Sequence, residues 1–124
     1  MGQPVVHFEV IARDAPALRA FYSNLFDWRI DADNPSGYGL IAREENLSQD
    51  GRGIGGGIGI ASPGYEGHVT FFVEVPDVEA ALAKAEILGG TPWGGPMTVL
   101  DGVEIGSFSD PEGHIIGLVK GAGP

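Results

Sequence analysis

The sequence predicts an α+β fold made of two copies of a βαβββ module. A strand-like alternation is followed at once by a helical pattern near residue 5 and again near residue 68. Shifting the chain by 63 positions superposes the two copies, with six identities and with the faces of the first strands in phase. Because a slip of one residue would exchange these faces, we infer a true duplication within one domain of residues 1–124, with modules at about 4–61 and 66–121.

The first module begins with VVHFEVIA at residues 5–12, which alternates between two faces. Asp14 can cap the helix that follows, and Pro16 falls in its first turn. Short strands are expected in WRIDAD, in YGLIAR and in the glycine run GRGIGGGIGI. The apolar stripe of the helix is expected in the core and consists of Leu18, Phe21, Tyr22, Leu25 and Phe26.

The second module repeats this order. GHVTFFVEV predicts a strand with Val69, Phe71, Val73 and Val75 on one face and His68, Thr70, Phe72 and Glu74 on the other. Asp77 is the expected cap of a helix that ends at Gly89, with an apolar stripe of Val78, Ala81, Leu82 and Ala85. Three strands are expected in TPWGGPMTVL, VEIGSFS and HIIGLV, and the turn DPEG leaves His114 facing solvent.

The composition excludes several classes of function. The chain carries 7 Lys and Arg against 17 Asp and Glu, a formal charge of −10, so nucleic acid is not an expected partner. It has no cysteine, which removes disulfides, thiolate zinc sites and cysteine nucleophiles. No stretch approaches the roughly 20 apolar residues of a membrane span, and no signal-peptide pattern is present. We therefore expect a soluble cytoplasmic protein without a membrane partner.

The run GRGIGGGIGI at residues 51–60 raises the question of phosphate binding. A phosphate loop requires a helix after the glycines, whereas ASPGYEGH and a further strand follow here. We therefore interpret the run as a strand whose glycines leave room for a flat ligand or another backbone. A bulged edge strand is the alternative.

The duplicated unit, with HFEV and FYSNLF in the first copy and DPEGHIIGLV near the end, resembles the vicinal oxygen chelate superfamily. This family is also called the glyoxalase/bleomycin resistance/dioxygenase superfamily. The resemblance implies two βαβββ modules whose sheets form a curved mixed cup around a small-molecule site, commonly completed by a second chain. In metal-dependent members it implies His and Glu ligands on the first and fourth strands of each module.

The resemblance also implies where such ligands would stand in this chain. His7 occupies the first-strand position and Thr70 its equivalent, while aligning DGRGIG with EGHIIG puts Gly55 and Gly117 at the two carboxylate positions. His68 shares a face with Thr70 but lies one pleat away. Since hard divalent metals need several donors, we predict no metal ligand and no cofactor.

The candidate ligand-binding residues are inward-facing strand residues, the glycines between them and aromatic rings within reach. They are His7, Glu9, Tyr38, Gly55, Gly57, His68, Thr70, Phe72, Trp93 and Phe108, with Trp28 as a further aromatic and Glu74 as a second inward carboxylate. Many rings and few polar anchors suit an apolar or aromatic compound. We predict a metal-free binding protein that sequesters such a compound, for example a natural-product antibiotic, in a homodimer.

Two alternatives of other classes stay open. The first is an enzyme, either a glyoxalase-like lyase, isomerase or dioxygenase that uses a divalent metal, or a metal-free acid/base catalyst that uses His7 with Glu9 or Glu74. The sequence identifies no third group that would orient such a histidine, so catalytic residues stay unassigned. The second alternative is a structural or regulatory dimer in which the cup is vestigial.

Overall fold

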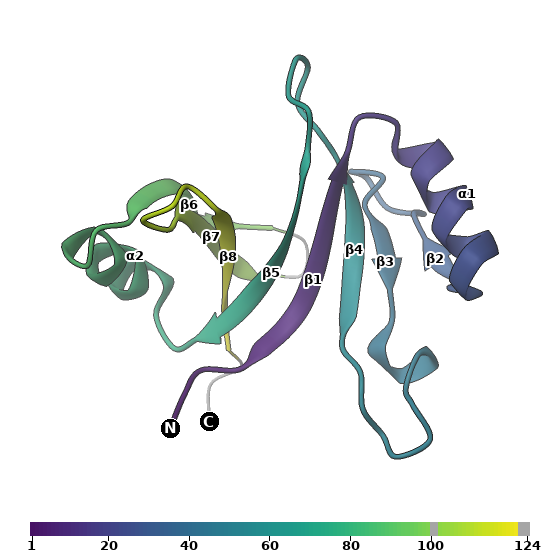
Figure 1. Ribbon diagram of the computed structural model, residues 1–124, viewed down its shortest axis with the longest axis horizontal. Coiled ribbons are helices and arrows are strands. Elements are labelled where there is room, and N and C mark those ends of the chain that lie inside the picture. Colours follow the sequence, from purple (N-terminus) through teal and green to yellow (C-terminus); the bar gives the residue numbers. More distant parts are fainter. Residues whose placement is uncertain (100–101, 122–124) are drawn as a thin grey trace. The chain divides into compact units, whose positions relative to one another are not determined.

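The computed structural model describes residues 1–99 and 102–121 (Figure 1). The chain divides into two compact units, called below the N-terminal unit (residues 7–69) and the C-terminal unit (residues 1–6 with the chain from Thr70 onward). Each unit is built on one helix and a mixed sheet. No helix of the described residues is long and apolar enough to cross a membrane.

The sheet of the N-terminal unit has the strand order β2-β3-β4-β1. Strand β1 runs parallel to β4, and the β4–β3 and β3–β2 pairs are antiparallel. Two of the expected strands are shorter than their sequence patterns suggest, and a short 3₁₀ helix, η1 (Arg43–Glu45), follows the third strand. The strands are β1 (Val5–Ala12), β2 (Ile30–Asp31), β3 (Gly39–Ile41) and β4 (Gly55–Ile60).

Helix α1 (Ala15–Phe26) begins where the sequence predicts it. The Asp14 carboxylate accepts the backbone N–H of Ala17 at 3.1 Å, which satisfies one of the free donors of the first turn. The helix ends at Asp27, whose φ of 58° is left-handed. The cap prediction at Asp14 is therefore confirmed.

The helix–sheet core of this unit is narrower than the predicted stripe. Leu18 and Tyr22 pack against the buried residues Ala12, Ala15, Ile41 and Ile58. The prediction that the whole stripe is core is wrong, because Phe21, Leu25 and Phe26 are 55%, 57% and 50% exposed. The strands β2 and β3 beneath α1 are only two and three residues long, so they offer little surface to the outer part of an apolar stripe.

The C-terminal unit has the strand order β5-β8-β7-β6 (Figure 1). Strand β5 runs parallel to β8, and the β8–β7 and β7–β6 pairs are antiparallel. The last residue of the expected stretch 91–100 lies outside the described residues. The elements are β5 (His68–Val75), α2 (Val78–Ile87), β6 (Thr91–Thr98), β7 (Glu104–Ser109) and β8 (Ile115–Lys120).

Helix α2 confirms the predicted cap, the predicted C-terminal glycine and the predicted faces of the first strand in the second module. The Asp77 carboxylate accepts the N–H of Ala80 at 3.0 Å, and Gly89 has a φ of 102°. Val75 belongs to the buried cluster beneath α2 with Val78, Leu82 and Leu118, and Val73 packs against it. The valine face of β5 therefore meets the helix, and Thr70 and Phe72 lie on the opposite face.

Candidate functional site

A hydrogen-bonded chain of three side chains lies on the face of the N-terminal sheet opposite α1. The Tyr38 hydroxyl donates to Glu9 Oε2 at 2.8 Å and lies 3.0 Å from His7 Nε2. His7 and Glu9 alternate with the core residues Phe8 and Val10 along β1, which sends their side chains away from the helix. Because the single Tyr38 proton goes to Glu9, His7 must donate its Nε2–H to the Tyr38 oxygen. Tyr38 thus orients the imidazole, a role that the sequence could not assign.

Tyr38 is itself held by the turn NPSG that precedes β3. Asn34 Nδ2 donates to the Tyr38 carbonyl at 2.7 Å, and Asn34 Oδ1 accepts the Tyr38 N–H at 3.1 Å. Gly37 continues this turn with a φ of 70°. Sequence reasoning found the turn but missed that Asn34 fixes the tyrosine; the signal was an Asn four residues before Tyr38.

Burial sets the protonation of the three groups. It raises the pKa of Glu9, and the hydrogen bond from Tyr38 opposes this only in part. Burial also lowers the pKa of His7, which favours the neutral imidazole. Burial, followed by the charge of Glu9, raises the pKa of Tyr38, so the phenol keeps its proton. The group therefore combines a neutral imidazole, a phenol and a carboxylate for binding or proton exchange.

The glycines of β4 do not leave open space beside this chain. A β-carbon on Gly57 would overlap the Tyr38 ring, and one on Gly56 would overlap the Phe8 ring on the other face. Gly55 lies against backbone, since its β-carbon would come 2.9 Å from the Ile41 carbonyl oxygen. The predicted strand is confirmed, but the expected room over Gly57 is filled by Tyr38. Each of these glycines is a seat, meaning a position where the missing side chain lets a ring or the backbone of the protein itself pack closely.

The sheet register changes the predicted equivalence of the fourth strands. Gly57 is paired with Glu9, and Gly117 is paired with Phe72, the residue equivalent to Glu9 in the repeat. Gly117 is therefore the counterpart of Gly57 and not of Gly55, so the alignment of DGRGIG with EGHIIG is wrong by two residues. Sequence identity between short glycine-rich segments could not detect this, because glycine recurs at every second position of β4.

The corrected register gives the metal-ligand positions no new donor. Gly55 is paired with His7, and extending the β5–β8 register by two residues puts Ile115 opposite Thr70. Neither has a side chain that binds metals, and no three His, Cys, Asp or Glu side chains of the described residues are grouped to hold an ion. The residues present do not fit the divalent metal of the metal-dependent members, because such an ion requires several fixed donors.

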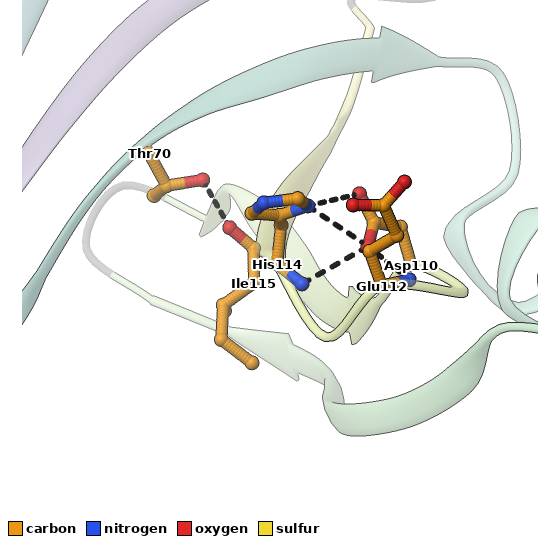
Figure 2. Close-up of polar contacts among 5 residues, drawn as sticks. All are labelled: Thr70, Asp110, Glu112, His114 and Ile115. Carbon is orange, nitrogen blue, oxygen red and sulfur yellow. Dashed lines mark hydrogen bonds and ion pairs between the residues drawn. The ribbon is translucent and has the colours of Figure 1, made fainter.

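Thr70 has a structural contact in the C-terminal unit. Its Oγ1 donates to the Ile115 carbonyl at 2.5 Å, and Thr70 is 8% exposed (Figure 2). Figure 2 also shows the turn before β8, where the Asp110 carboxylate accepts the N–H groups of Glu112 and His114 and lies 2.9 Å from His114 Nδ1. His114 is exposed, as expected, but it is paired with Asp110 across the DPEG turn.

The remaining predicted binding residues lie outside the His7–Tyr38–Glu9 chain. His68 Nδ1 lies 2.5 Å from the Tyr65 hydroxyl, and burial lowers the pKa of His68. Phe72 is 8% exposed with its ring over Gly117, and Trp93 on β6 is 54% exposed. Phe108 packs against the core beneath α2, so the structure does not bring it to the face of Phe72.

Trp28 also lies on the helix side of its sheet, where its ring centroid is 5.4 Å from that of Phe8.

Two cavities are distinct from the hydrogen-bonded chain. One, of about 330 Å³, lies beneath α2 and is lined by Val73, Leu118 and Phe108; the other, of about 440 Å³, lies at the start of α1. Neither contains His7, Glu9 or Tyr38, and these three with Gly57 form the candidate site.

The fold and the site define an α+β protein of duplicated βαβββ modules, with a hydrogen-bonded chain that joins the first strand to Tyr38 before β3. The family model of the Glyoxalase/Bleomycin resistance protein/Dioxygenase superfamily matches residues 5–118. The chain therefore belongs to this superfamily, which confirms the fold class and the resemblance expected from the sequence.

Solved structures agree with this fold. A member of the same superfamily from Vibrio splendidus 12B01 matches with a TM-score of 0.62 at 12% identity, covering 97% of this chain and 100% of its own. Methylmalonyl-CoA epimerase from Streptomyces coelicolor, a variant in complex with 2-nitronate-propionyl-CoA, matches with a TM-score of 0.60 at 17% identity, covering 98% and 99%. A hypothetical protein from Bacillus halodurans C-125 gives 0.66 at 10% identity, covering 100% and 98%. No curated protein matches the chain in sequence.

Proposed function

We propose that this protein is a metal-independent binding protein for a small, largely aromatic molecule of the antibiotic type, which it sequesters in the cytoplasm as a homodimer. The observation that carries the proposal is the His7–Tyr38–Glu9 chain, which supplies a few fixed polar groups on one face of the sheet. Ligand sites commonly combine apolar lining with a small number of well-placed polar groups. The ligand would meet the rings of Tyr38 and His7 first, and Glu9 would orient it.

The rings of the candidate site support a planar ligand. The centroids of His7 and Tyr38 are 6.3 Å apart with an angle of 18° between their planes, so the two rings are nearly parallel. Tyr38 is held by Asn34 and by the seat at Gly57, so little ordering remains to be done on binding. A preordered pair of parallel rings favours a flat aromatic partner over a flexible one.

The absence of grouped metal ligands in the described chain favours a binding protein over the metal-dependent enzymes of the superfamily. The metal-dependent lyase, isomerase and dioxygenase reactions predicted as alternatives need an ion with open positions, and the residues at the ligand positions do not fit one. Sequestration needs only affinity, which His7 and Glu9 on β1 and Tyr38 before β3 can supply without an ion.

Neutral planar probes test the proposal. We expect acridine or phenazine to bind in the micromolar to submillimolar range at pH 8 with EDTA present, measured by calorimetry, and we expect the affinity not to change when Mg²⁺, Mn²⁺ or Zn²⁺ replaces EDTA. Tyr38→Ala should weaken the binding about tenfold, since a stacked ring contributes about 1–3 kcal/mol. Saturable binding of neither probe, or binding only with a metal, would overturn the proposal.

The dimer is a separate expectation. On the helix-facing side of β5, α2 covers Val73 and Val75, whereas Val69 and Phe71 remain 74% and 41% exposed. Apolar side chains left exposed beside a covered pair mark a surface that a second copy could bury. Native mass spectrometry at micromolar concentration should give twice the chain mass of 12.9 kDa, and Val69→Glu should shift the distribution to monomer. A wild-type protein that is monomeric at this concentration would contradict the homodimer.

A further inference from the structure

Among the residues that the structure describes, Glu9 is a carboxylate without a counter-ion. It lies partly buried on β1, and within the described residues its side chain accepts a hydrogen bond from the neutral phenol of Tyr38 alone. Ion pairs in residues 1–99 and 102–121 join Arg29 to Glu45, Arg52 to Asp50 and His114 to Asp110, and none of them reaches Glu9. A phenol can share a hydrogen bond but cannot neutralise a charge, so burying this carboxylate costs free energy in the unliganded protein.

The neighbouring histidine does not supply the missing charge. Burial lowers the pKa of His7, and at pH 8 its imidazole is neutral. Burial raises the pKa of Glu9 and the Tyr38 hydrogen bond lowers it, and no cation acts on this pKa. When Glu9 is ionised, the three side chains together therefore carry a net negative charge.

One oxygen of Glu9 remains available to a ligand. Tyr38 uses Oε2, and Oε1 has no hydrogen-bond partner in the described part of the chain. Every fully buried side-chain nitrogen or oxygen of the described residues has a partner, so an unpaired Oε1 must be in contact with solvent. A donor that arrives from solution can bind Oε1 without displacing Tyr38.

We propose that Glu9 recognises an organic cation, so that the ligand of this site is a planar aromatic compound bearing a protonated amine, amidine or guanidine group. This inference rests on the proposed function and specifies its ligand class. The cationic N–H donates to Glu9 Oε1, and its charge neutralises the carboxylate. The aromatic part lies against the rings of Tyr38 and His7, and the face of Tyr38 also attracts a cation. The formal charge of −10 favours the approach of such a ligand from solution.

A matched pair of probes tests the charge. Acridine is neutral at pH 8, whereas 9-aminoacridine has the same ring system and is protonated, with N–H donors. We expect 9-aminoacridine to bind the intact wild-type protein at least about tenfold more tightly than acridine, in calorimetry at pH 8 with EDTA and moderate salt.

A matched pair of variants tests the residue. Glu9→Gln keeps the size of the side chain and the acceptor for Tyr38 but removes the charge, and it should lower the affinity for 9-aminoacridine about tenfold to the level of acridine. Glu44→Gln removes the same charge from an exposed position on η1 and should change neither affinity. Thermal unfolding of both variants checks that they are folded, and Glu9→Gln should be at least as stable as wild type because a costly buried charge is gone.

The outcomes distinguish failure of the cation inference from failure of the proposed function. Equal affinity of wild type for the two probes, or equal losses of affinity in Glu9→Gln and Glu44→Gln, would overturn the cation inference. The proposed function would stand in that case as long as acridine binds. Failure of wild type to bind either probe would overturn both.

Discussion

Replacing Gly57 with alanine should lower the free energy of unfolding by about 2–4 kcal/mol and break the His7–Tyr38–Glu9 chain. The β-carbon of the new residue would overlap the Tyr38 ring, and a backbone shift cannot relieve the overlap, because Asn34 holds the Tyr38 backbone on both its N–H and its carbonyl. The side chain must leave its seat, which releases the hydrogen bonds to His7 and Glu9 at the same time. Urea unfolding measures the stability, and the imidazole ¹⁵N shifts of His7 report whether Nε2 still carries the proton.

Gly59→Ala is the matched control on the same strand. Its β-carbon would lie 2.9 Å from the terminal methyl of Ile11 and 3.3 Å from the Tyr38 ring, so a small movement of the flexible Ile11 end can relieve the contact. We expect a loss of about 1 kcal/mol or less and unchanged His7 signals. Equal effects of the two substitutions would show that glycine is needed in β4 for backbone reasons and that Tyr38 does not depend on its seat.

The periodicity of the sequence was sufficient to predict the fold because each element carries its own local signal. The first strand has the predicted bounds 5–12, and Asp14 and Asp77 cap the two helices through their own carboxylates. The α1 stripe was predicted less well, because an apolar pattern shows that a helix has an apolar side but does not show how much sheet lies beneath it.

The sequence identified the three residues of the candidate site as candidates, but it did not predict that they contact one another. His7, Glu9 and Tyr38 were all named, since inward phase and aromatic character are visible in the sequence. Their contact joins positions 31 and 29 residues apart and depends on where the turn at Asn34 delivers Tyr38, which no local pattern specifies. The glycine run was ambiguous for a similar reason: a glycine that admits a ligand and a glycine that seats a ring have the same sequence.

Replacing Phe72 with alanine should cost about 3 kcal/mol or more, the largest loss expected from a single ring in the C-terminal unit. The ring is 8% exposed and lies over Gly117, its partner on β8, so removing it uncovers both strands. Gly117→Ala alone should cost about 1–3 kcal/mol, since its β-carbon would come 2.6–2.7 Å from the Phe72 ring atoms.

The two losses should not add. In a Phe72→Ala background the new methyl group at position 117 meets empty space, so the double variant should be about as stable as Phe72→Ala alone, a coupling of about 1–3 kcal/mol in a double-mutant cycle by urea unfolding. Additivity within about 0.5 kcal/mol would mean that Gly117 is required by the backbone and not by the ring. Non-additivity would show that the second module has the arrangement found at Gly57 in the first, a glycine on the last strand covered by an aromatic ring. The two modules differ in the residue that covers this glycine. In the second module it is Phe72, an apolar ring on the first strand of that module. The first module has Glu9 at the equivalent position, and Tyr38 covers the glycine instead. The repeat thereby keeps its packing in both halves while one half gains a carboxylate with an open oxygen.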